Sequence, residues 1–198
     1  AGDDLAQCFL HAALDSMGLV RSATRRTTVK TRVISGHQHV VRVDEEMESD
    51  ITPAEEELLL DRVRDLMGTA KPGVVILEDY NKGVLTERVI AGVIAAAQEH
   101  GIPVAVDPKK KNFFAYRGVD LFKPNVKELR EGLKIDLRGG DIPGVRNAVA
   151  LLEERMANKA SLITLSEHGV YVHAGNEEYV LPAHKRKIVD VSGAGDSV

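Results

Sequence analysis

The sequence predicts an α/β protein with one mostly parallel β-sheet flanked by helices, and two observations support this prediction. Short apolar runs of strand length alternate along the chain with longer segments whose apolar residues recur every three or four positions. Such alternation is typical of strand–helix–strand units, in which successive strands lie parallel. Acidic, amide and glycine residues follow directly after the apolar runs, which is where open α/β sheets bind ligands.

The composition excludes several classes of protein. A chain of 198 residues, 43% of them hydrophobic, suffices for one domain with a core. The formal net charge of −4 and the 4% aromatic content argue against a nucleic-acid partner, because phosphate binding needs a basic surface and base stacking needs rings. No apolar run approaches the roughly 20 residues of a membrane span, and the single cysteine excludes an internal disulfide. We therefore expect a cytoplasmic protein with no membrane partner.

The first part of the chain predicts a helix and a hairpin. Residues 3–17 carry an apolar helical face, on which we expect Cys8 to pack into the core. Residues 27–44 alternate in character around a central glycine, which predicts a β-hairpin with one polar face. We interpret His37 and His39 in this hairpin as facing solvent and not as metal ligands, because no third ligand is evident.

The remaining elements follow in alternation. Thr52-Pro53-Ala54-Glu55 starts a helix that runs to about Met67, because Thr caps, Pro suits the first turn and Glu bonds back. The run Val74–Leu77 is continuously apolar, which predicts a strand buried on both faces by helices. Further strands are predicted at 103–106, 119–122, 161–164, 170–172, 179–181 and 188–191, with helices at 86–101, 125–133 and 141–157.

The ends of the predicted strands carry the chemistry. Parallel strands end at the same edge of a sheet, so we expect an active site along that edge. The residues concerned are Asp79 to Gly83, Asp107-Pro108-Lys109, Asn125 with Glu128, Ser166 to Gly169, and Ser192 to Asp196.

The last of these segments is the most specific. Gly193-Ala194-Gly195 exposes consecutive backbone N–H groups at the start of a predicted helix, which suits a phosphate or a developing anion. Asp196 then lies where the helix dipole favours a carboxylate. It orients a metal or accepts a proton from an attacking hydroxyl, and the second role fits phosphoryl transfer; an acid that only complements the dipole is the alternative. A dinucleotide fingerprint is excluded because Val198 occupies its third glycine position.

These motifs resemble the ribokinase-like (pfkB-type) carbohydrate kinase family. Asp190 to Asp196 is similar to the closing signature of that family, which implies that Asp196 is the catalytic base and that Gly193, Ala194 and Gly195 form the anion hole. Asn125-Val126-Lys127-Glu128 resembles its Asn-x-x-Glu element, which implies Mg²⁺ bound through water beside the phosphates of ATP; a capped helix start is the alternative for this pair. Thr164 to Gly169 resembles the segment that lines the nucleotide, implying contacts with ATP from Thr164, Ser166, Glu167 and Gly169.

Within the family the chain resembles the heptose-7-phosphate kinase branch, and Lys109–Lys111 and Lys123 depart from the pattern of that branch. The likeness implies transfer from ATP to the anomeric hydroxyl of heptose 7-phosphate. Another pfkB-type sugar or sugar-phosphate kinase is the alternative, and a non-catalytic nucleotide- or sugar-binding regulator is the alternative of another class. A nucleotidyltransferase is excluded because the chain has no His-x-Gly-His element. The likeness rests on Thr27 to Val33 with Gln38 and Arg42 to Asp44, on Asp79 to Gly83, on Asp107 to Lys109 with Phe113 and Tyr116 to Gly118, and on Pro124-Asn125 with Glu128.

Five further side chains are candidates for binding substrate or nucleotide. Asp79 and Lys82 are candidates for substrate contact, with a local ion pair in a turn as the alternative. Arg32 and Arg42 suit a sugar phosphate because Arg binds phosphate with two parallel hydrogen bonds; a surface strand is the alternative. Lys109 suits a phosphate of the nucleotide, with a solvated loop as the alternative for a triple-lysine run.

The resemblance also bears on domain organisation. It implies that residues 27–44 are a lid hairpin that covers the sugar and joins two protomers into a homodimer. It further implies that residues 1–198 are a partial kinase domain, without the N-terminal strand–helix–strand unit and the C-terminal helices of the family.

Overall fold

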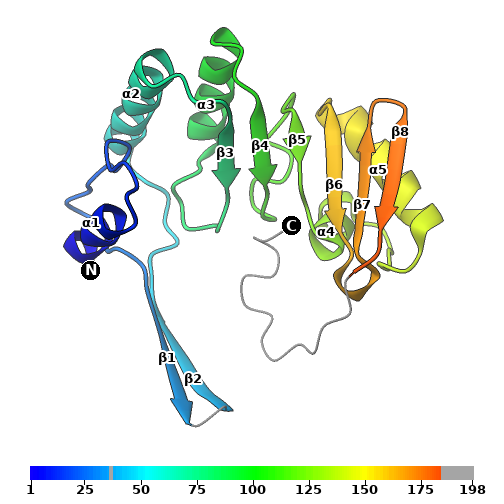
Figure 1. Cartoon of the computed structure of the whole chain (residues 1–198), viewed down its shortest axis with the longest axis horizontal. Helices are drawn as coiled ribbons and strands as arrows, with labels where there is room; N and C mark the ends of the chain where they lie inside the picture. Colours follow the sequence, from blue (N-terminus) through cyan, green and yellow to red (C-terminus); the bar gives the residue numbers. More distant parts are fainter. Residues whose placement is uncertain (36–37, 184–198) are drawn as a thin grey trace.

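The computed structural model describes residues 1–35 and 38–183 (Figure 1). The interpretations of His37, of the strand at 188–191 and of Gly193 to Asp196 lie outside these residues, as does that of the His39 side chain. The helices are α1 (Gly2–His11), α2 (Pro53–Thr69), α3 (Glu87–Glu99), α4 (Val126–Leu133) and α5 (Ile142–Met156), with a short 3-10 helix η1 (Ser166–His168). The strands are β1 (Val29–Ser35), β2 (Gln38–Glu45), β3 (Val75–Glu78), β4 (Val104–Asp107), β5 (Leu121–Phe122), β6 (Ala160–Thr164), β7 (Val170–Ala174) and β8 (Glu177–Leu181).

The described strands form a six-stranded sheet and a separate two-stranded hairpin. The large sheet has the order β3-β4-β5-β6-β7-β8. Strands β3 to β6 pair in parallel, and β7 and β8 then pair antiparallel. Helix α3 connects β3 to β4, and α4 with α5 connect β5 to β6. The mostly parallel sheet that the alternating pattern predicts is therefore confirmed.

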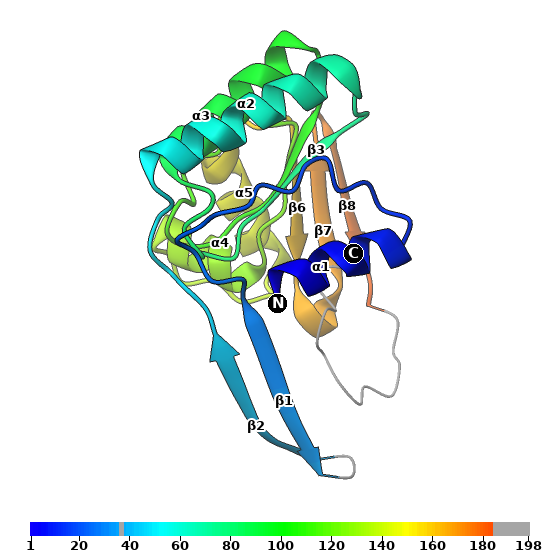
Figure 2. The same cartoon turned by 90° about the vertical axis from the view of Figure 1, so that its left-hand side faces the viewer.

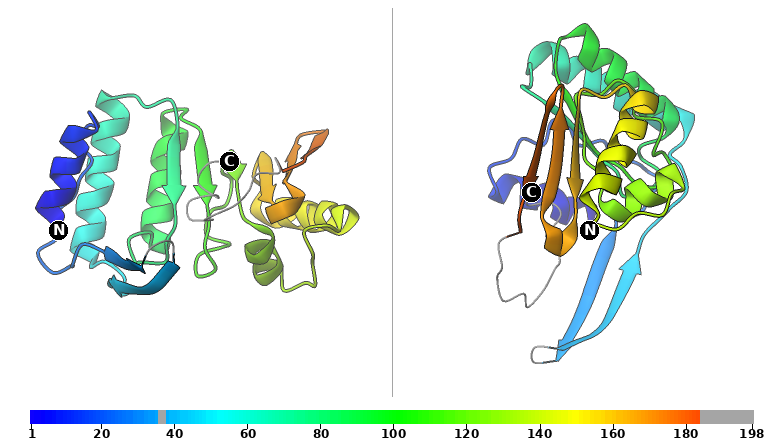
Figure 3. Two further views of the ribbon diagram at one scale, coloured as in Figure 1. Left: turned by 60° about the horizontal axis from the view of Figure 1, so that its bottom comes forward. Right: turned by 90° about the vertical axis from the view of Figure 1, so that its right-hand side faces the viewer.

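One face of the sheet carries the core. Leu77, Val106, Phe122 and Ser161 are paired in register across β3 to β6 and are all buried. Consecutive right-handed crossovers in one direction place their helices on the same face, and Figure 3 shows α4 and α5 against one side of the strands. The ring of Phe113 meets that of Phe122 edge-on at 5.2 Å.

The other face of β3 is open, contrary to the prediction for residues 74–77. Ile76, which points away from the core, is 64% exposed. Strand β3 lies at the edge of the described sheet, and the described helices do not cover this face of it. A continuous apolar run indicates side chains that prefer burial, but only the tertiary arrangement decides which of them are covered.

Local capping signals are confirmed. Thr52 and Glu55 form a capping box at the start of α2, and Asn125 with Glu128 forms another at the start of α4. Helices α2 and α3 pack closely at Gly92, where an added Cβ would lie 2.6 Å from Cδ2 of Leu60.

Helix α1 differs from its prediction. It ends at His11, short of the predicted residue 17, and none of its residues is buried. Cys8 is exposed, so the expectation that it packs in the core is wrong. Its apolar pattern identifies a face suited to packing, but the described residues leave that face mostly exposed, with Ala6 and Phe9 half-buried. None of the described helices is long and apolar enough to span a membrane.

The hairpin of β1 and β2 projects from the body of the molecule (Figures 1 and 2). Its register places Lys30 opposite Asp44 and Arg32 opposite Arg42, which confirms one polar face. The alternate positions pair Val33 with Val41, and both of these valines are exposed. The hairpin therefore presents an apolar face to solvent as well as a charged one.

Candidate functional site

The carboxyl ends of four parallel strands meet at one edge, as the sequence predicts. The backbone N–H of Asp79 donates to the carbonyl of Asp107 at 3.0 Å, which joins the ends of β3 and β4. Asn125 and Thr164 form an isolated parallel bridge beyond β5 and β6. Polar groups that are far apart in the sequence therefore lie side by side along this edge.

Asp79 is held rigidly at the end of β3. Its carboxylate accepts a hydrogen bond from the backbone N–H of Asn81 at 2.7 Å and from the hydroxyl of Tyr116 at 2.8 Å. Burial raises the pKa of Tyr116, and the neighbouring Asp79 carboxylate raises this pKa further, so the phenol remains a donor. Asp79 is only 3% exposed, and its orientation is fixed before any ligand arrives.

Lys82 does not pair within its own turn. Its Nζ lies 2.6 Å from Glu46 and 2.8 Å from Glu48, both at the base of the hairpin beyond β2. Hydrogen bonds to these two carboxylates raise the pKa of Lys82. The loop that carries Asp79 is thereby tied to the base of the hairpin.

A cavity of about 600 Å³ lies between the hairpin base and the end of β3. Lys30 and Glu46 line it from the hairpin, and Asp79 and Lys82 line it from the loop. Sequence reasoning did not single out Lys30 or Glu46. The alternation of the hairpin places Lys30 on the polar face, but the contact between Lys82 and Glu46 spans 36 residues and has no local signal.

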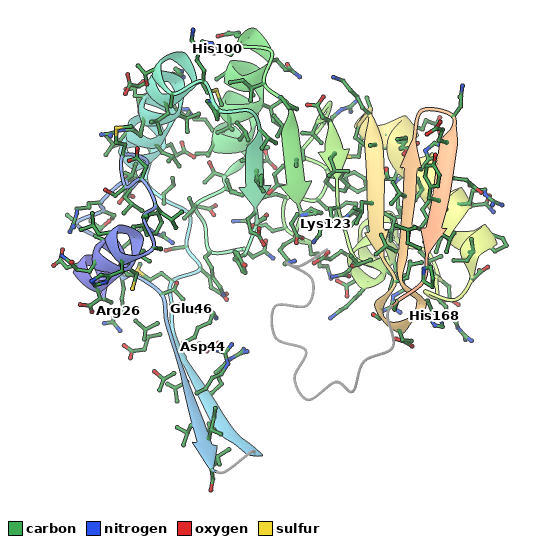
Figure 4. The ribbon with its side chains drawn as sticks, in the orientation of Figure 1. Arg26, Asp44, Glu46, His100, Lys123 and His168 are labelled. Atoms are coloured by element: carbon green, nitrogen blue, oxygen red, sulfur yellow. The ribbon has the colours of Figure 1, made fainter. Side chains whose placement is uncertain are left out.

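A chain of alternating charges runs along the ends of β4 and β5. Lys123 lies 2.9 Å from Asp107, Asp107 lies 3.5 Å from Lys109, and Lys109 lies 2.6 Å from Glu128. Burial lowers the pKa of Lys109, but its bonds to Glu128 and Asp107 outweigh this effect, so the pKa is raised. Figure 4 shows Lys123 at this lower edge of the sheet. Lys109 is therefore not a freely solvated loop lysine.

Asn125 and Glu128 combine a structural role with a suitable set of ligand atoms. Asn125 Oδ1 accepts from the Glu128 N–H at 2.9 Å, and Glu128 Oε2 accepts from the Asn125 N–H at 2.9 Å. Among the described residues, no three His, Cys, Asp or Glu side chains are grouped as a metal site. Amide and carboxylate oxygens suit Mg²⁺, which keeps several waters and shares its coordination with phosphates. The oxygen atoms of the pair are of the type that binds magnesium through water, and in this structure Glu128 Oε1 pairs with Lys109 at 2.6 Å.

The segment after β6 forms a tight turn at the same edge. Ser166 adopts a left-handed conformation with φ of 55°. Gly169 has φ of 93°, and a Cβ there would overlap the carbonyl oxygen of Leu181. The bridge places Thr164 beside Asn125, and Ser166 and Gly169 belong to the turn that follows, in which the Gly169 N–H donates to the Ser166 carbonyl at 3.1 Å. The side chain of Glu167 is 78% exposed.

The two arginines of the hairpin are close to each other but distant from this edge. Arg32 and Arg42 are directly paired across the strands, an arrangement of like charges that is unfavourable without a counter-charge. Arg42 lies 3.0 Å from Asp44. Both arginines are exposed on the hairpin, which extends away from the body (Figure 1).

The closing signature is the remaining part of the candidate site. Gly193, Ala194, Gly195 and Asp196 lie outside the described residues. Their assignment as an anion hole and a catalytic base stays a prediction.

Comparison with known proteins assigns the chain to a family. The whole chain, residues 1–198, matches the pfkB family carbohydrate kinases. It is 36% identical over 198 residues to the bifunctional protein HldE of Geotalea uraniireducens, covering 100% of this chain and 40% of that protein. It is 40% identical over 181 residues to the bifunctional protein HldE of Azorhizobium caulinodans, covering 90% of this chain and 36% of that protein. The chain therefore spans well under half of the length of these relatives.

Solved structures share the fold at lower identity. The tetrameric inhibited form of phosphofructokinase-2 from Escherichia coli superposes with a TM-score of 0.76 at 19% identity, over 99% of this chain and 63% of that one. Ribokinase from Giardia lamblia superposes with a TM-score of 0.72 at 17% identity, over 98% of this chain and 59% of that one. These likenesses establish the ribokinase-like arrangement of sheet and helices.

Proposed function

Because the chain belongs to the pfkB family of carbohydrate kinases, we propose that it transfers the γ-phosphoryl group of ATP to a hydroxyl of a sugar phosphate. The proposed substrate is heptose 7-phosphate, and the product is heptose 1,7-bisphosphate. The observation that carries the proposal is that two sets of polar residues, each suited to one ligand, lie along the same edge of the sheet. Asp79 beside its cavity offers a site for a sugar, and Lys109 with Asn125 and Glu128 offers a site for phosphates and Mg²⁺.

On the sugar side, the rigid carboxylate of Asp79 accepts hydrogen bonds from sugar hydroxyls. Tyr116 and Asn81 hold it in one orientation, which reduces the entropy lost on binding. Lys82, which lines the cavity, supplies positive charge for the phosphate group that the sugar already carries.

On the nucleotide side, the ATP site is lined by Thr164, Ser166, Glu167 and Gly169. Lys109 contacts the phosphates of ATP. Asn125 and Glu128 orient the water molecules of Mg²⁺. When bound, Mg²⁺ neutralises charge on the phosphates during transfer. The sugar phosphate and ATP are thereby held next to each other at the ends of β3 to β6.

Asp196 is the proposed base. It accepts the proton of the attacking hydroxyl as the new O–P bond forms and the bond to the ADP oxygen breaks. The backbone N–H groups of the Gly193–Gly195 turn, continuing to Asp196, stabilise the negative charge on the transferred group. The signature in the sequence supports these roles, because a protein that only bound the ligands would need no base.

We further propose a homodimer joined through the hairpin, located in the cytoplasm. The exposed apolar face that includes Val33 and Val41 supports an interface there, because apolar patches on a surface commonly mark contacts between proteins. A cytoplasmic location is consistent with a supply of ATP and sugar phosphates.

A screen of phosphoryl transfer tests the proposal. ADP release is measured with heptose 7-phosphate, fructose 6-phosphate, ribose and fructose as acceptors, each with and without Mg²⁺. We expect the highest kcat/KM with heptose 7-phosphate. A preference for fructose 6-phosphate or for an unphosphorylated sugar would instead show another sugar kinase of the same fold. ATP binding without transfer to any acceptor would show a non-catalytic regulator.

A further inference from the structure

The carboxylate of Glu46 bridges two lysines at the base of the hairpin. Its Oε1 lies 2.6 Å from Nζ of Lys82, and its Oε2 lies 3.0 Å from Nζ of Lys30. Hydrogen bonds from these two lysines lower the pKa of Glu46, so it is charged at neutral pH. Figure 4 shows Glu46 at the point where the hairpin leaves the body. One carboxylate therefore joins a cation of the hairpin to a cation of the Asp79 loop.

These three side chains line the cavity beside Asp79. The other two carboxylates that line it are held by other groups. Asp79 is fixed by Asn81 and Tyr116, and the exposed Glu78 accepts a hydrogen bond from the Tyr80 hydroxyl at 3.2 Å. Glu46 is thus the cavity carboxylate that neutralises the two lysines.

The other carboxylates beside the two lysines also interact with another group or with solvent. Asp44 lies 3.2 Å from Lys30, but it also lies 3.0 Å from Arg42. Glu48 lies 2.8 Å from Lys82, but its side chain is 72% exposed and is readily solvated. The side chain of Glu46 is only 17% exposed. Displacement of Glu46 would therefore leave the two lysines available to another anion within the cavity.

A phosphate monoester is that anion. It carries a charge of about −1.5 to −2 at neutral pH and three strong acceptor oxygens, so it matches two ammonium groups better than one carboxylate does. We propose that Glu46 is a built-in competitor of the phosphate group of the substrate, and that a phosphorylated sugar displaces Glu46 from Lys30 and Lys82. This inference rests on the proposed function and names the cations that select a phosphorylated sugar.

The exchange has a mechanical consequence. When Glu46 leaves Lys82, the described part of the hairpin base keeps only the exposed Glu48 as an ion-pair partner of Lys82. Binding of a phosphorylated sugar is thereby coupled to the position of the hairpin. An unphosphorylated sugar has no group that displaces Glu46, and it leaves this contact in place.

Titration with inorganic phosphate in the absence of ATP, followed by calorimetry, tests the inference. We expect Glu46→Gln to lower the Kd for phosphate about threefold to tenfold, and Lys82→Met to raise it at least about tenfold. Glu45→Gln is the matched control, because it removes the same charge from the next residue, which pairs with Arg26 at 3.2 Å. It is expected to leave the Kd unchanged. Sugar phosphate is expected to displace the phosphate.

An unchanged or raised Kd in Glu46→Gln would overturn the inference, and so would displacement of the bound phosphate by ATP. Thermal unfolding of each variant establishes that it is folded, and Glu46→Ala serves as a second variant if the glutamine variant does not fold. The result of the phosphate titration can be distinguished from the result of the phosphoryl-transfer screen that tests the proposed function. An enzyme that phosphorylates sugars while Glu46→Gln binds phosphate as wild type does refutes only this inference. A protein that phosphorylates no sugar refutes the proposed function, and the titration still decides the role of Glu46.

Discussion

The hydroxyl of Tyr116 donates a 2.8 Å hydrogen bond to Oδ2 of Asp79 across 37 residues of sequence, and both side chains are buried. This bond connects the long loop between β4 and β5 to the end of β3. It determines which way a candidate sugar-binding carboxylate points, so the packing of the core and the binding of substrate share one contact.

Tyr116→Phe removes this donor and leaves a buried carboxylate oxygen without its partner. We expect the free energy of unfolding to fall by about 1–3 kcal/mol, measured by urea denaturation. The KM for the sugar should rise while the KM for ATP stays constant. Tyr179→Phe is the control, because it removes a comparable 2.9 Å bond to Glu177 on the exposed strand β8. Equal effects of the two changes on the sugar KM would contradict the proposed role of Asp79.

The two capping boxes allow stability to be separated from function. Asn125→Ala and Thr52→Ala each remove a capping side chain, and each should lower the free energy of unfolding by about 1 kcal/mol. Only Asn125→Ala should raise the Mg²⁺ concentration needed for half-maximal activity, because only α4 begins at the active edge. If both variants keep the wild-type Mg²⁺ requirement, Asn125 is a capping residue alone.

Gly83→Ala tests the tight contact between the Asp79 loop and the segment that follows the hairpin. Gly83 has φ of 75°, and a Cβ there would overlap the backbone carbonyl of Ser49. Gly101 has φ of 65° but open space around it, so Gly101→Ala measures the backbone strain alone, roughly 1–2 kcal/mol. We expect Gly83→Ala to lower the free energy of unfolding by more than this control does. Equal losses would show that the contact with Ser49 relaxes freely.

Acid should weaken the pairing of α5 with β8. Hydrogen bonds from Arg146 and Tyr171 lower the pKa of Glu178 from its ordinary value of 4.5 to about 2. Because the pKa is lower in the folded state, the stabilisation is complete above pH 4.5 and is lost as the pH falls toward about 2. Glu178→Gln should therefore have a lower Tm than wild type at pH 7, and the two Tm values should converge as the pH falls through this window. A difference in Tm that is constant with pH would contradict the ion pair.

Asp196→Asn tests the proposed base. The amide keeps the size of the side chain but cannot accept the proton, so kcat should fall by about 10²–10⁴-fold. The Kd for ATP should stay the same, measured by equilibrium titration. A kcat within twofold of wild type would remove Asp196 from the mechanism.

Local signals in the sequence are reliable where neighbouring residues determine the outcome. Thr52 with Glu55 and Asn125 with Glu128 identify helix starts, because both partners of each hydrogen bond lie within four residues. The positions of Asp79 and Asn125 at the edge follow from parallel pairing, which the alternation of strands and helices predicts.

Burial at some positions and distant ion pairs depend on tertiary packing, and the sequence predicted them only in part: the buried faces of α3 and α5 follow from helical spacing, but other positions do not. The apolar patterns around Cys8 and Ile76 indicate a preference for burial, but both side chains are exposed because neighbouring elements do not cover them in the described structure. Likewise, Lys82 has several carboxylates nearby in sequence, yet it pairs with Glu46 and Glu48 on a different element. Such choices depend on how the chain packs and not on any spacing along it.

The order of strands in the large sheet bears on how the protein is made. From β3 to β8, each strand pairs with the strand that precedes it in the chain. Among the strands that the structure describes, none of this sheet is inserted between two strands that precede it in the chain. As the polypeptide leaves the ribosome, each new strand therefore meets an edge that is already formed. We expect this sheet to assemble in the direction of translation, because each pairing joins strands that follow one another in the chain.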